Sequence, residues 1–567
     1  MKKLLDVVPK FLYVKILITS SIIFFSAVAE TLGLGMIMPI ISSLLGGSDG
    51  GALGSILSSI FGESLSLNMI LLLMLLMFSI KFILGIAKNY MMFGIEWQIR
   101  GYWMSVLYKY NTLKSFQSFE SQKGGIITND IINETLKAAS ALRQILEFLG
   151  QSTLMIGLLT ILLISNPYYS SVFLIVGVIF IVIIKLTIMN KVGFYGLQRQ
   201  KYEGDVYHEV NEMINGMKTI RYLELESFLF KRFNIRLQKL VRLMRKNETV
   251  RRLPSQIMEI IVILIFVFGL IIANQDPYFN IISLLPFIGM LAIVAIKLFT
   301  NIGTVVSNIT AIINLWASVE RISDLVFESN QKNLVNQNNI PNLTHSFNDC
   351  ISFENLDFYY QKEKPIIKNL NVEFKKGTFN VLMGDSGSGK STLGKILIGL
   401  YKPINGNIKI DGIKIDSIPH EEIRHLIGYV DQEHFFFNGT VIENLQHKLG
   451  DIDEEKINNI LALTNAKGFV DALPNGLNTM IGDKGDFLST GQKARLALAR
   501  ALLMDPSILI LDEITSSLDE KSSKYILETI IKLKTSITII VISHDPLVID
   551  MTENLFELSD YKITKIR

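Results

Sequence analysis

The sequence predicts two parts of different fold class, an all-α polytopic membrane domain with six transmembrane helices and, after it, an α/β domain. Three observations lead to this prediction. Long apolar runs fill about the first 310 residues, whereas the remainder mixes apolar and polar residues as soluble α/β domains do. From about Ile351 onward, strand-like apolar runs alternate with helix-like patterns, and a glycine-rich loop joins one such pair.

Composition supports the division and excludes some classes of function. At 567 residues, the chain is too long for a single hydrophobic core. A hydrophobic fraction of 49% and a mean hydropathy of +0.37 indicate that part of it is not solvated by water. The net charge of +3 is too small to favour nucleic acid as a partner. Cys350 is the only cysteine, which excludes an intramolecular disulfide and a cysteine-rich metal site.

Six apolar segments are long enough, or nearly so, to cross a bilayer, which needs about 20 residues per helix. We place them at 14–44, 67–92, 146–165, 168–190, 255–273 and 279–309. The links between them alternate between short segments without Lys or Arg and long segments rich in both. By the positive-inside rule the basic links face the cytosol, and so do both termini.

The N-terminus allows one competing interpretation. Two lysines, an apolar run and Ala27-Val28-Ala29 resemble a secretory signal with its cleavage site. The apolar character continues from Leu32 to Leu45, however, where a signal peptide would have ended. We therefore expect a first transmembrane helix.

The two long cytosolic links keep helical apolar spacing, and helices of that length would extend some tens of ångströms beyond the membrane at about 1.5 Å per residue. Glycines suggest that the chain turns near 116–125 and near 215–222. We divide the chain into a transmembrane domain at 1–325, a linker at 326–350 and the α/β domain at 351–567.

Charged residues inside the predicted spans are candidates for function, because burying a charge in the bilayer is costly. Glu30 and Lys81 lie deep in their spans, and for them a role in a substrate cavity and a structural ion pair are equally good interpretations. For Lys185, Glu259 and Lys297, nearer the cytosolic ends, a structural pair or a snorkelling side chain is the better one. Pro39 and Pro286 are expected to kink the first and last spans.

A P-loop stands at the centre of the second part. An apolar run at 379–383 leads into it and a helix-like pattern follows, which is the context that such a loop requires. Backbone N–H groups of the loop would bind phosphates, Lys390 would add a positive charge and Ser391 would offer a hydroxyl to Mg²⁺, so ATP is the expected ligand. The alternative is an ordinary turn that matches by chance. The candidate residues are Gly384, Asp385, Ser386, Gly387, Ser388, Gly389, Lys390, Ser391 and Thr392.

Candidate catalytic side chains follow two further predicted strands. The apolar run 508–511 ends in Asp512 and Glu513, and we expect Asp512 to hold Mg²⁺ and Glu513 to orient and deprotonate the attacking water. A second run, 537–542, ends near His544, which can donate a hydrogen bond to a terminal phosphate oxygen. Two acids can also merely begin a turn, and a histidine after a strand is often only a surface residue.

In this order, these pieces resemble the nucleotide-binding domain of the ATP-binding cassette (ABC) transporters. The family's short signature, usually Leu-Ser-Gly-Gly-Gln, is present as Leu488-Ser489-Thr490-Gly491-Gln492. The resemblance covers nearly the whole chain, because six spans followed by one cassette resemble an exporter-type half-transporter. It implies an α/β P-loop ATPase domain at 351–567.

The resemblance extends to single residues. It implies that Tyr360 stacks on adenine, with Tyr359 as a close rival, and that Gln432 contacts Mg²⁺ and the attacking water. Asp519 matches the loop that crosses between two cassettes, and 482–485 is similar to the exporter segment that meets the cytosolic extensions. The turns near 116–125 and 215–222 match the family's coupling helices. The signature residues expected to serve a second subunit's nucleotide are Ser489, Gly491 and Gln492.

Thr490 is the main departure from the family, which has glycine at this position. Glycine allows a close backbone approach to phosphate, and a β-branched residue restricts it. Because Ser489 and Gly491 are intact, we expect Thr490 to tune turnover rather than to abolish it.

The resemblance implies an ATP-driven exporter or flippase of the bacterial inner membrane that works as a dimer. One chain carries Lys390, Glu513, Ser489 and His544 together, so a homodimer would be complete, although a heterodimer is also possible. The cargo is expected to be amphipathic, either a modified peptide or a lipid-linked molecule. The alternative is an ABC ATPase that gates a channel or regulates a membrane partner.

Overall fold

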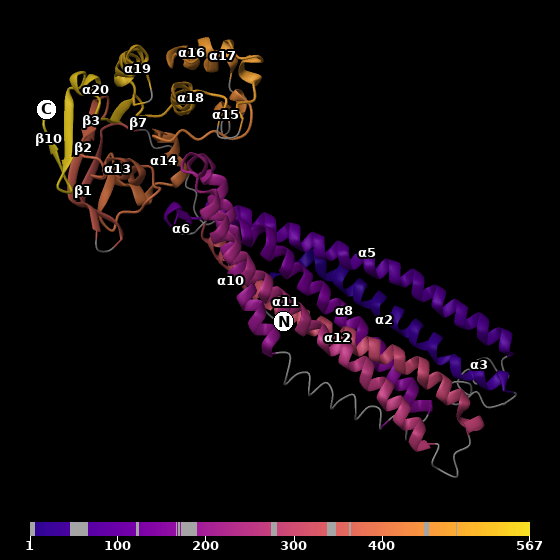
Figure 1. Cartoon of the computed structure of the whole chain (residues 1–567). Coiled ribbons are helices and arrows are strands. Elements are labelled where there is room, and N and C mark those ends of the chain that lie inside the picture. Colours follow the sequence, from indigo (N-terminus) through magenta and orange to yellow (C-terminus); the bar gives the residue numbers. More distant parts are fainter. Residues whose placement is uncertain are drawn as a thin grey trace. The chain divides into compact units, whose positions relative to one another are not determined.

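The computed structural model describes residues 6–45, 66–120, 124–165, 167, 171, 190–273, 281–336, 347–361, 364–446, 453–482, 485–516 and 518–567. Two compact units make up the chain (Figure 1). The first comprises Met1–Lys114 and Glu120–Gln337, and the second comprises Asn338–Arg567 together with the short segment Ser115–Phe119. The fold class predicted from the sequence, a helical membrane domain fused to an α/β domain, is confirmed.

Every element described in the first unit is a helix. Its elements are η1 (Lys10–Leu12), α2 (Tyr13–Gly35), α3 (Ile37–Leu44), α5 (Leu67–Leu113), α6 (Phe116–Glu120, shared with the second unit), α7 (Gly124–Asn129), η2 (Asp130–Glu134), α8 (Thr135–Ser165), α10 (Asn190–Tyr222), α11 (Glu226–Ala273) and α12 (Ile281–Asn336). Among the described residues, four segments are long and apolar enough to cross a membrane: Lys10–Leu44, Leu67–Leu113, Gly124–Ser165 and Pro286–Asn330. The predicted fifth span at 255–273 is helical within α11. The predicted fourth span at 168–190 and Lys185 lie almost wholly outside the described residues.

Helices α2, α5, α8 and α12 pack into one bundle. Apolar residues at helical spacing form its core, among them Trp103, Leu107, Leu142 and Ile322, all nearly inaccessible. The indole Nε1 of Trp103 donates to the carbonyl of Val7 at 3.1 Å, so its polar group is satisfied. In the N-terminal half of α5, apolar side chains such as Leu72, Leu75, Phe82 and Ile83 are exposed. An exposed apolar face of this kind is what contact with lipid requires.

Proline shapes the first span as the sequence predicts. Helix α2 ends at Gly35, four residues before Pro39, and α3 begins at Ile37. Pro39 cannot donate to the carbonyl of Gly35 and its ring crowds that carbonyl, which accounts for the break. Pro286 lies within the first turns of α12, which continues through it.

The last helix is longer than the sequence analysis placed it. We expected the transmembrane domain to end near residue 325. Helix α12 instead continues to Asn336, and the first compact unit ends at Gln337. Val319, Ile322 and Val326 lie in the bundle core. Their helical spacing carries the apolar face past the predicted boundary, so the helix does not stop there.

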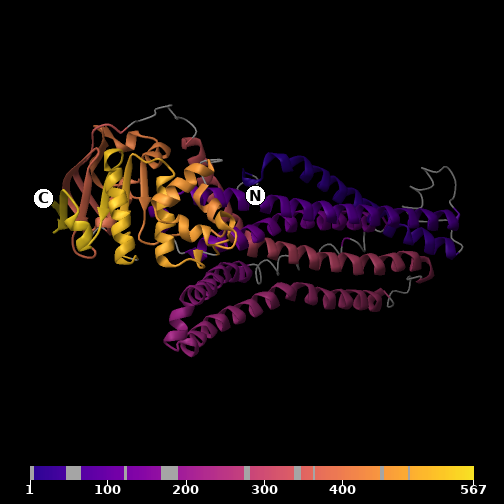
Figure 2. The same ribbon diagram turned by 90° about the horizontal axis from the view of Figure 1, so that it is seen from above.

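The second cytosolic turn lies after Gly216 rather than at it. Helix α10 runs through Gly216 to Tyr222, and the chain reverses at 223–225 before α11; these two helices form the magenta hairpin of Figure 2. Glu224 has φ +52°, the N–H of Leu225 donates to the carbonyl of Ile220 at 3.0 Å, and that of Glu224 donates to Arg221 at 3.4 Å. A residue with positive φ and these two backbone hydrogen bonds ends a helix, even where that residue is not glycine. A single glycine inside a helix, such as Gly216, lowers the stability of the helix by only about 1 kcal/mol and does not end it.

The second unit holds two sheets. The first has the order β2-β1-β4-β5, with all neighbours antiparallel: β1 (Cys350–Gln361), β2 (Lys364–Lys375), β4 (Asn405–Ile410) and β5 (Ile413–Lys414). The second has the order β10-β9-β3-β8-β7-β6: β3 (Phe379–Met383), β6 (Ile427–Val430), β7 (Ile508–Asp512), β8 (Thr538–Ile542), β9 (Asn554–Ser559) and β10 (Lys562–Lys565).

The helices of this unit are α13 (Lys390–Leu397), α14 (His420–Leu426), α15 (Val441–Gln446), α16 (Glu454–Leu463), α17 (Lys467–Asp471), α18 (Thr490–Leu502), α19 (Glu520–Lys532) and α20 (Pro546–Asp550), with short 3₁₀ turns at Ile415–Ser417, Gly476–Asn478 and Leu533–Thr535. Helices α16 and α17 lie beyond α18, away from the strands (Figure 1). Strands β7 and β8 are buried along their whole length. They are continuous apolar runs because a parallel sheet covered on both faces buries every side chain.

Candidate functional site

The glycine-rich loop joins β3 to α13, and two of its glycines are required by the backbone. Gly384 has φ +148° and Gly389 has φ +106°. A Cβ atom on Gly384 would lie 2.3 Å from the carbonyl oxygen of Leu558, and one on Gly389 would lie 2.7 Å from Cγ2 of Ile366. No L-residue fits either position without moving the loop. The sequence therefore fixes a loop that bends back over the start of α13.

Lys390 begins α13 and points its ammonium into this loop. Its Nζ donates to the carbonyl oxygens of Gly384 and Asp385, both at 2.8 Å. The side chain is largely buried, and burial lowers the pKa of Lys390 from its ordinary value. A poorly hydrated ammonium held between carbonyls is a strong electrostatic partner for a phosphate oxygen.

Three parallel strands bring the predicted polar residues to one edge of the sheet. Gln432 follows β6, Glu513 follows β7 and His544 follows β8. The amide Nε2 of Gln432 donates to Oε2 of Glu513 at 2.6 Å, and Nε2 of His544 lies 3.8 Å from Oε1 of Glu513. The structure thus brings together the three residues that were predicted to act on the nucleotide and the attacking water.

Glu513 holds an unusual backbone conformation. Its φ of +50° lies in the left-handed region, which costs about 1 kcal/mol or more for a residue other than glycine. The N–H of Glu513 donates to the carbonyl of Ile542 at 2.9 Å, so the turn is anchored to β8. Strain of this kind persists where the surroundings enforce it, and it is typical of functional positions.

Asp512 is buried beside the P-loop and only partly satisfied. One oxygen, Oδ2, accepts from the hydroxyl of Tyr429 at 3.3 Å, and the carboxylate also bonds to Ser391. Its other oxygen, Oδ1, is buried and has no hydrogen-bond partner among the described residues. Burial, assisted by the carboxylate of Asp431, raises the pKa of Asp512.

This arrangement fits a small hard cation. Mg²⁺ prefers oxygen ligands, and an unpartnered carboxylate oxygen beside a hydroxyl is a suitable donor set. Ser391, Asp512 and Gln432, the residues predicted to hold Mg²⁺, are thus compatible with it. Sequence reasoning missed Tyr429, whose pKa burial raises, so that its hydroxyl remains a proton donor to Asp512. Its position in strand β6, three residues before Gln432, was the available signal.

The structure favours Tyr360 over Tyr359 as the aromatic residue beside the nucleotide. The hydroxyl of Tyr360 lies 3.1 Å from Oγ1 of Thr392 in α13, which ties this ring to the P-loop. Phe358 and Tyr401 pack edge-on against the ring at 5.0 and 5.3 Å, and 48% of Tyr360 remains exposed. No such contact joins Tyr359 to the loop among the described residues.

The signature forms the start of α18. Ser489 caps the helix: its Oγ accepts from the N–H of Gln492 at 3.3 Å, and Oε1 of Gln492 accepts from the N–H of Ser489 at 2.9 Å. Ser489 and Thr490 are exposed, and no positive φ is found at Thr490 or Gly491. Thr490 thus occupies an ordinary first helical position that a β-branched residue tolerates, and its effect on turnover stays a prediction.

The remaining predicted residues fall into two groups. Asp519 caps α19, accepting from the N–H of Ser522 at 3.1 Å, and this hydrogen bonding lowers its pKa. The predicted segment 482–485 lies partly outside the described residues, because positions 483 and 484 are not among them.

In the first unit, Glu30 pairs with Lys81 at 3.2 Å, and also with Lys297 at 2.6 Å. The structural pair expected for Lys297 is thus present.

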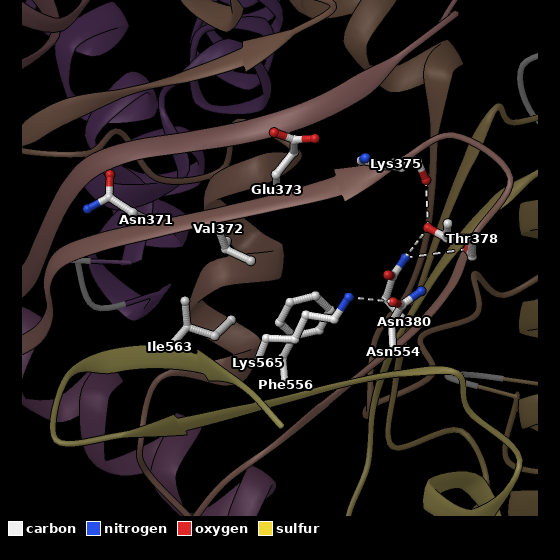
Figure 3. A pocket seen from close by; sticks show the side chains of 10 residues that line it. All are labelled: Asn371, Val372, Glu373, Lys375, Thr378, Asn380, Asn554, Phe556, Ile563 and Lys565. Atoms are coloured by element: carbon white, nitrogen blue, oxygen red, sulfur yellow. Dashed lines mark hydrogen bonds between the residues drawn. The ribbon is translucent and has the colours of Figure 1, made fainter. Parts of the chain in front are cut away.

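A cavity in the second unit lies away from the residues predicted to bind the nucleotide. It has a volume of about 330 Å³ and lies between β2 and the β9–β10 hairpin (Figure 3). Its polar side chains bond one another: Lys565 donates to Asn554 at 2.9 Å, and Asn380 donates to Thr378 at 2.8 Å. None of the predicted site residues lines it. The candidate functional site is therefore the P-loop edge.

Comparison with known protein families matches both units. A family model described as "ABC transporter transmembrane region" matches residues 16–275, and one described as "ABC transporter" matches 367–516. A solved structure of a bacterial Atm1-family ABC exporter with ATP bound superposes with a TM-score of 0.80 and 20% identity, covering 98% of this chain and 95% of that one. At this identity the superposition shows the fold alone.

Several relatives share sequence with the chain. The heterocyst differentiation ATP-binding protein HepA of Nostoc sp. is 31% identical over 59% of this chain, and the chain spans 54% of that relative's length. An ABC transporter ATP-binding protein of Mycoplasma genitalium is 26% identical, with 86% of this chain and 83% of the relative covered. A multidrug resistance ABC transporter protein of Lactococcus lactis is 27% identical over 75% of this chain and 71% of its own length.

The contacts of Tyr360 predict how its removal affects nucleotide binding. We expect Tyr360→Ala to raise the dissociation constant for ATP by about two- to twelvefold, because one aromatic stacking partner contributes about 0.5–1.5 kcal/mol. Tyr359→Ala, the matched control on the same strand, should bind ATP normally. Titration with a fluorescent ATP analogue measures both. A larger loss for Tyr359→Ala would reverse the assignment.

The burial of Asp512 predicts opposite effects on stability and activity. A carboxyl whose pKa is raised by folding contributes stability only at low pH and costs stability once the pH rises through its folded pKa. At neutral pH, the Asp512→Asn variant should therefore have a melting temperature no lower than that of the unaltered chain. Its rate of ATP hydrolysis should fall about a hundredfold or more, because the substitution removes the carboxylate that is expected to bind Mg²⁺. Thermal melts and ADP release test the two effects. A strongly lowered Tm would show that the carboxylate serves structure instead.

Proposed function

The chain belongs to the ABC transporter family, with the transmembrane region and the nucleotide-binding domain of an exporter-type half-transporter in one polypeptide, and on this premise we propose that it uses ATP hydrolysis to export or flip an amphipathic substrate. The observation that carries the proposal is the Glu513 carboxylate, held at 2.6 Å by Gln432 and facing His544 at 3.8 Å. A general base must be oriented in this way to act on a water molecule.

Each residue of the proposed site has its own role in ATP binding or hydrolysis. Lys390 and the backbone of 384–392 bind the phosphates, and Tyr360 stacks on the base. Glu513 orients and deprotonates the attacking water, while His544 donates a hydrogen bond to the terminal phosphate. Ser391, Asp512 and Gln432 would hold Mg²⁺, which would neutralise phosphate charge. Each role uses a side chain already fixed by the contacts described above.

We propose that the active form is a dimer. Ser489 and Thr490 are exposed at the N-terminus of α18, where the free N–H groups of a helix favour an anion. Each ATP would lie between the P-loop of one chain and Ser489, Gly491 and Gln492 of another, with Asp519 in the crossing loop. One chain carries both halves, which favours a homodimer, and a heterodimer with a related chain is the second possibility.

Coupling to the membrane would pass through the cytosolic turns. Ser115–Phe119 groups with the nucleotide-binding unit, where Phe116 packs edge-on against Tyr401 at 5.6 Å. Tyr401 also packs on Tyr360, so this aromatic contact is continuous with the proposed adenine site. Closure of two cassettes around ATP would shift these turns and convert an inward-facing cavity into an outward-facing one, and hydrolysis would reset it.

We place the protein in the bacterial inner membrane, with the nucleotide-binding domain and both termini in the cytosol. The basic cytosolic links and the exposed apolar face of α5 support this placement. A modified peptide or a lipid-linked molecule is the proposed cargo. The alternative, an ATPase that gates a channel or regulates a partner, predicts ATP hydrolysis in proteoliposomes without vectorial movement of an amphiphile.

The role of Glu513 predicts that binding and hydrolysis separate. Glu513→Gln should retain ATP binding while steady-state hydrolysis falls by about 10²–10⁴-fold, because the amide cannot accept the proton of water. Nucleotide binding and ADP release should be measured on the same preparation. Glu528→Gln, on the exposed side of α19 in the same domain, is the matched control and should hydrolyse ATP normally. Undiminished turnover in Glu513→Gln would refute the assignment.

A further inference from the structure

Charged side chains from four membrane helices meet within the helical bundle. Oε1 of Glu30 on α2 accepts from Lys297 of α12 at 2.6 Å and from Lys81 of α5 at 3.2 Å. Glu30 is nearly buried, with 11% of its side chain exposed, whereas the two lysines are 39% and 35% exposed. One carboxylate is thus shared by two ammonium groups, and the three side chains together keep one uncompensated positive charge.

A third lysine lies on the same face of α5. Lys88 follows Lys81 by two helical turns, about 10 Å along the axis. Among the residues that the structure describes, Lys88 makes no ion pair or hydrogen bond. Glu147 of α8, another carboxylate of the bundle, already accepts from Arg143 at 2.6 Å, and Arg143 also donates to Glu96 at 3.0 Å.

Lys88 and Lys297 face one cavity. Its volume is about 100 Å³, and its polar lining consists of Ser26, Glu30, Lys88, Glu147, Gln151 and Lys297. Pockets for drug-sized ligands measure about 300–1,000 Å³, so this cavity has room for a head group rather than for a whole substrate. Ile23, Leu146 and Leu154 complete the lining with apolar surface.

The charges around the cavity are unbalanced. The lining itself carries two cations, Lys88 and Lys297, and two carboxylates, Glu30 and Glu147. Glu30 is also shared with Lys81, and Arg143 is paired with both Glu147 and Glu96, so that among the described residues four cations stand against three carboxylates once these ion-pair partners are counted. Cations at membrane depth are retained where a partner compensates them. An anion placed between Lys88 and Lys297 would supply that compensation, and the amide of Gln151 could donate to it.

We propose that this cavity binds the anionic group, a phosphate or a carboxylate, of the amphiphile that the protein transports. Lys88 and Lys297 bind the anion, and Glu30 holds Lys297 in place between cargo molecules. The apolar part of the cargo lies against the apolar lining and the exposed surface beside Lys81 and Lys297. The inference rests on the proposed transport function, and it specifies the chemistry of the cargo.

The test uses the full-length protein in nanodiscs of neutral phosphatidylcholine, with ATP hydrolysis followed as ADP release. The probes are hexadecyl phosphate, zwitterionic hexadecylphosphocholine and inorganic phosphate. Hexadecyl phosphate should stimulate hydrolysis at concentrations where the other two do not. Lys88→Gln should raise its half-maximal concentration about tenfold or more, as expected for loss of a charge-assisted hydrogen bond, and Lys88→Arg should restore most of the response.

Lys109→Gln is the matched control, because Lys109 is exposed on the same helix away from the cavity. It should respond to hexadecyl phosphate like the unaltered chain. An equal response to the phosphate and phosphocholine amphiphiles would overturn the inference without any variant. So would an equal response of Lys88→Gln, or stimulation by inorganic phosphate alone. Absence of hydrolysis in the unaltered protein both with and without the amphiphiles would instead refute the proposed function itself.

Discussion

Parallel pairing of β3, β8, β7 and β6 is the constraint on which the site depends. The register pairs Leu382 with Ile542, Asp512 with Ile542, and Val430 with Leu511, so these strands end at nearly the same level. Whatever follows each strand must emerge at one edge of the sheet. The P-loop, His544, Glu513 and Gln432 are therefore neighbours although they are far apart in the sequence. Shifting β7 by one residue would separate Glu513 from both of its partners.

The site is held in an energetically unfavourable form, which is consistent with function. Asp512 keeps a buried oxygen without a partner, Glu513 keeps a left-handed backbone, and Lys390 keeps a poorly hydrated ammonium. Each feature costs stability, and the fully buried strands on either side enforce all three. The membrane unit has a comparable feature where two lysines share the single carboxylate of Glu30 and Lys88 is left without a partner among the described residues.

Sequence patterns predicted which residues meet at the P-loop edge, because these residues lie at strand ends and in one loop, where local order determines position. Glu513 and His544 could each be placed from the apolar run before it, whereas Gln432 was identified from the family resemblance. The turn at Glu224 could not, because a glutamate there gives no sign of a left-handed backbone. The pairing of Lys297 with Glu30 joins helices far apart in the chain, and only their packing brings the two together. Tyr429 was missed because an aromatic residue in a strand normally indicates a core position.

Sharing of each ATP between two copies of the chain is the central claim, and mixed dimers test it most directly. A chain with Lys390→Ala and a chain with Ser489→Arg each lack one half of every site when alone, but a mixed dimer contains one complete site. Co-reconstituted in equal amounts, the two should recover up to about a quarter of the unaltered ATPase activity, since random pairing makes half of the dimers mixed. A mixture no more active than either variant alone, or a fully active Ser489→Arg chain, would contradict the account.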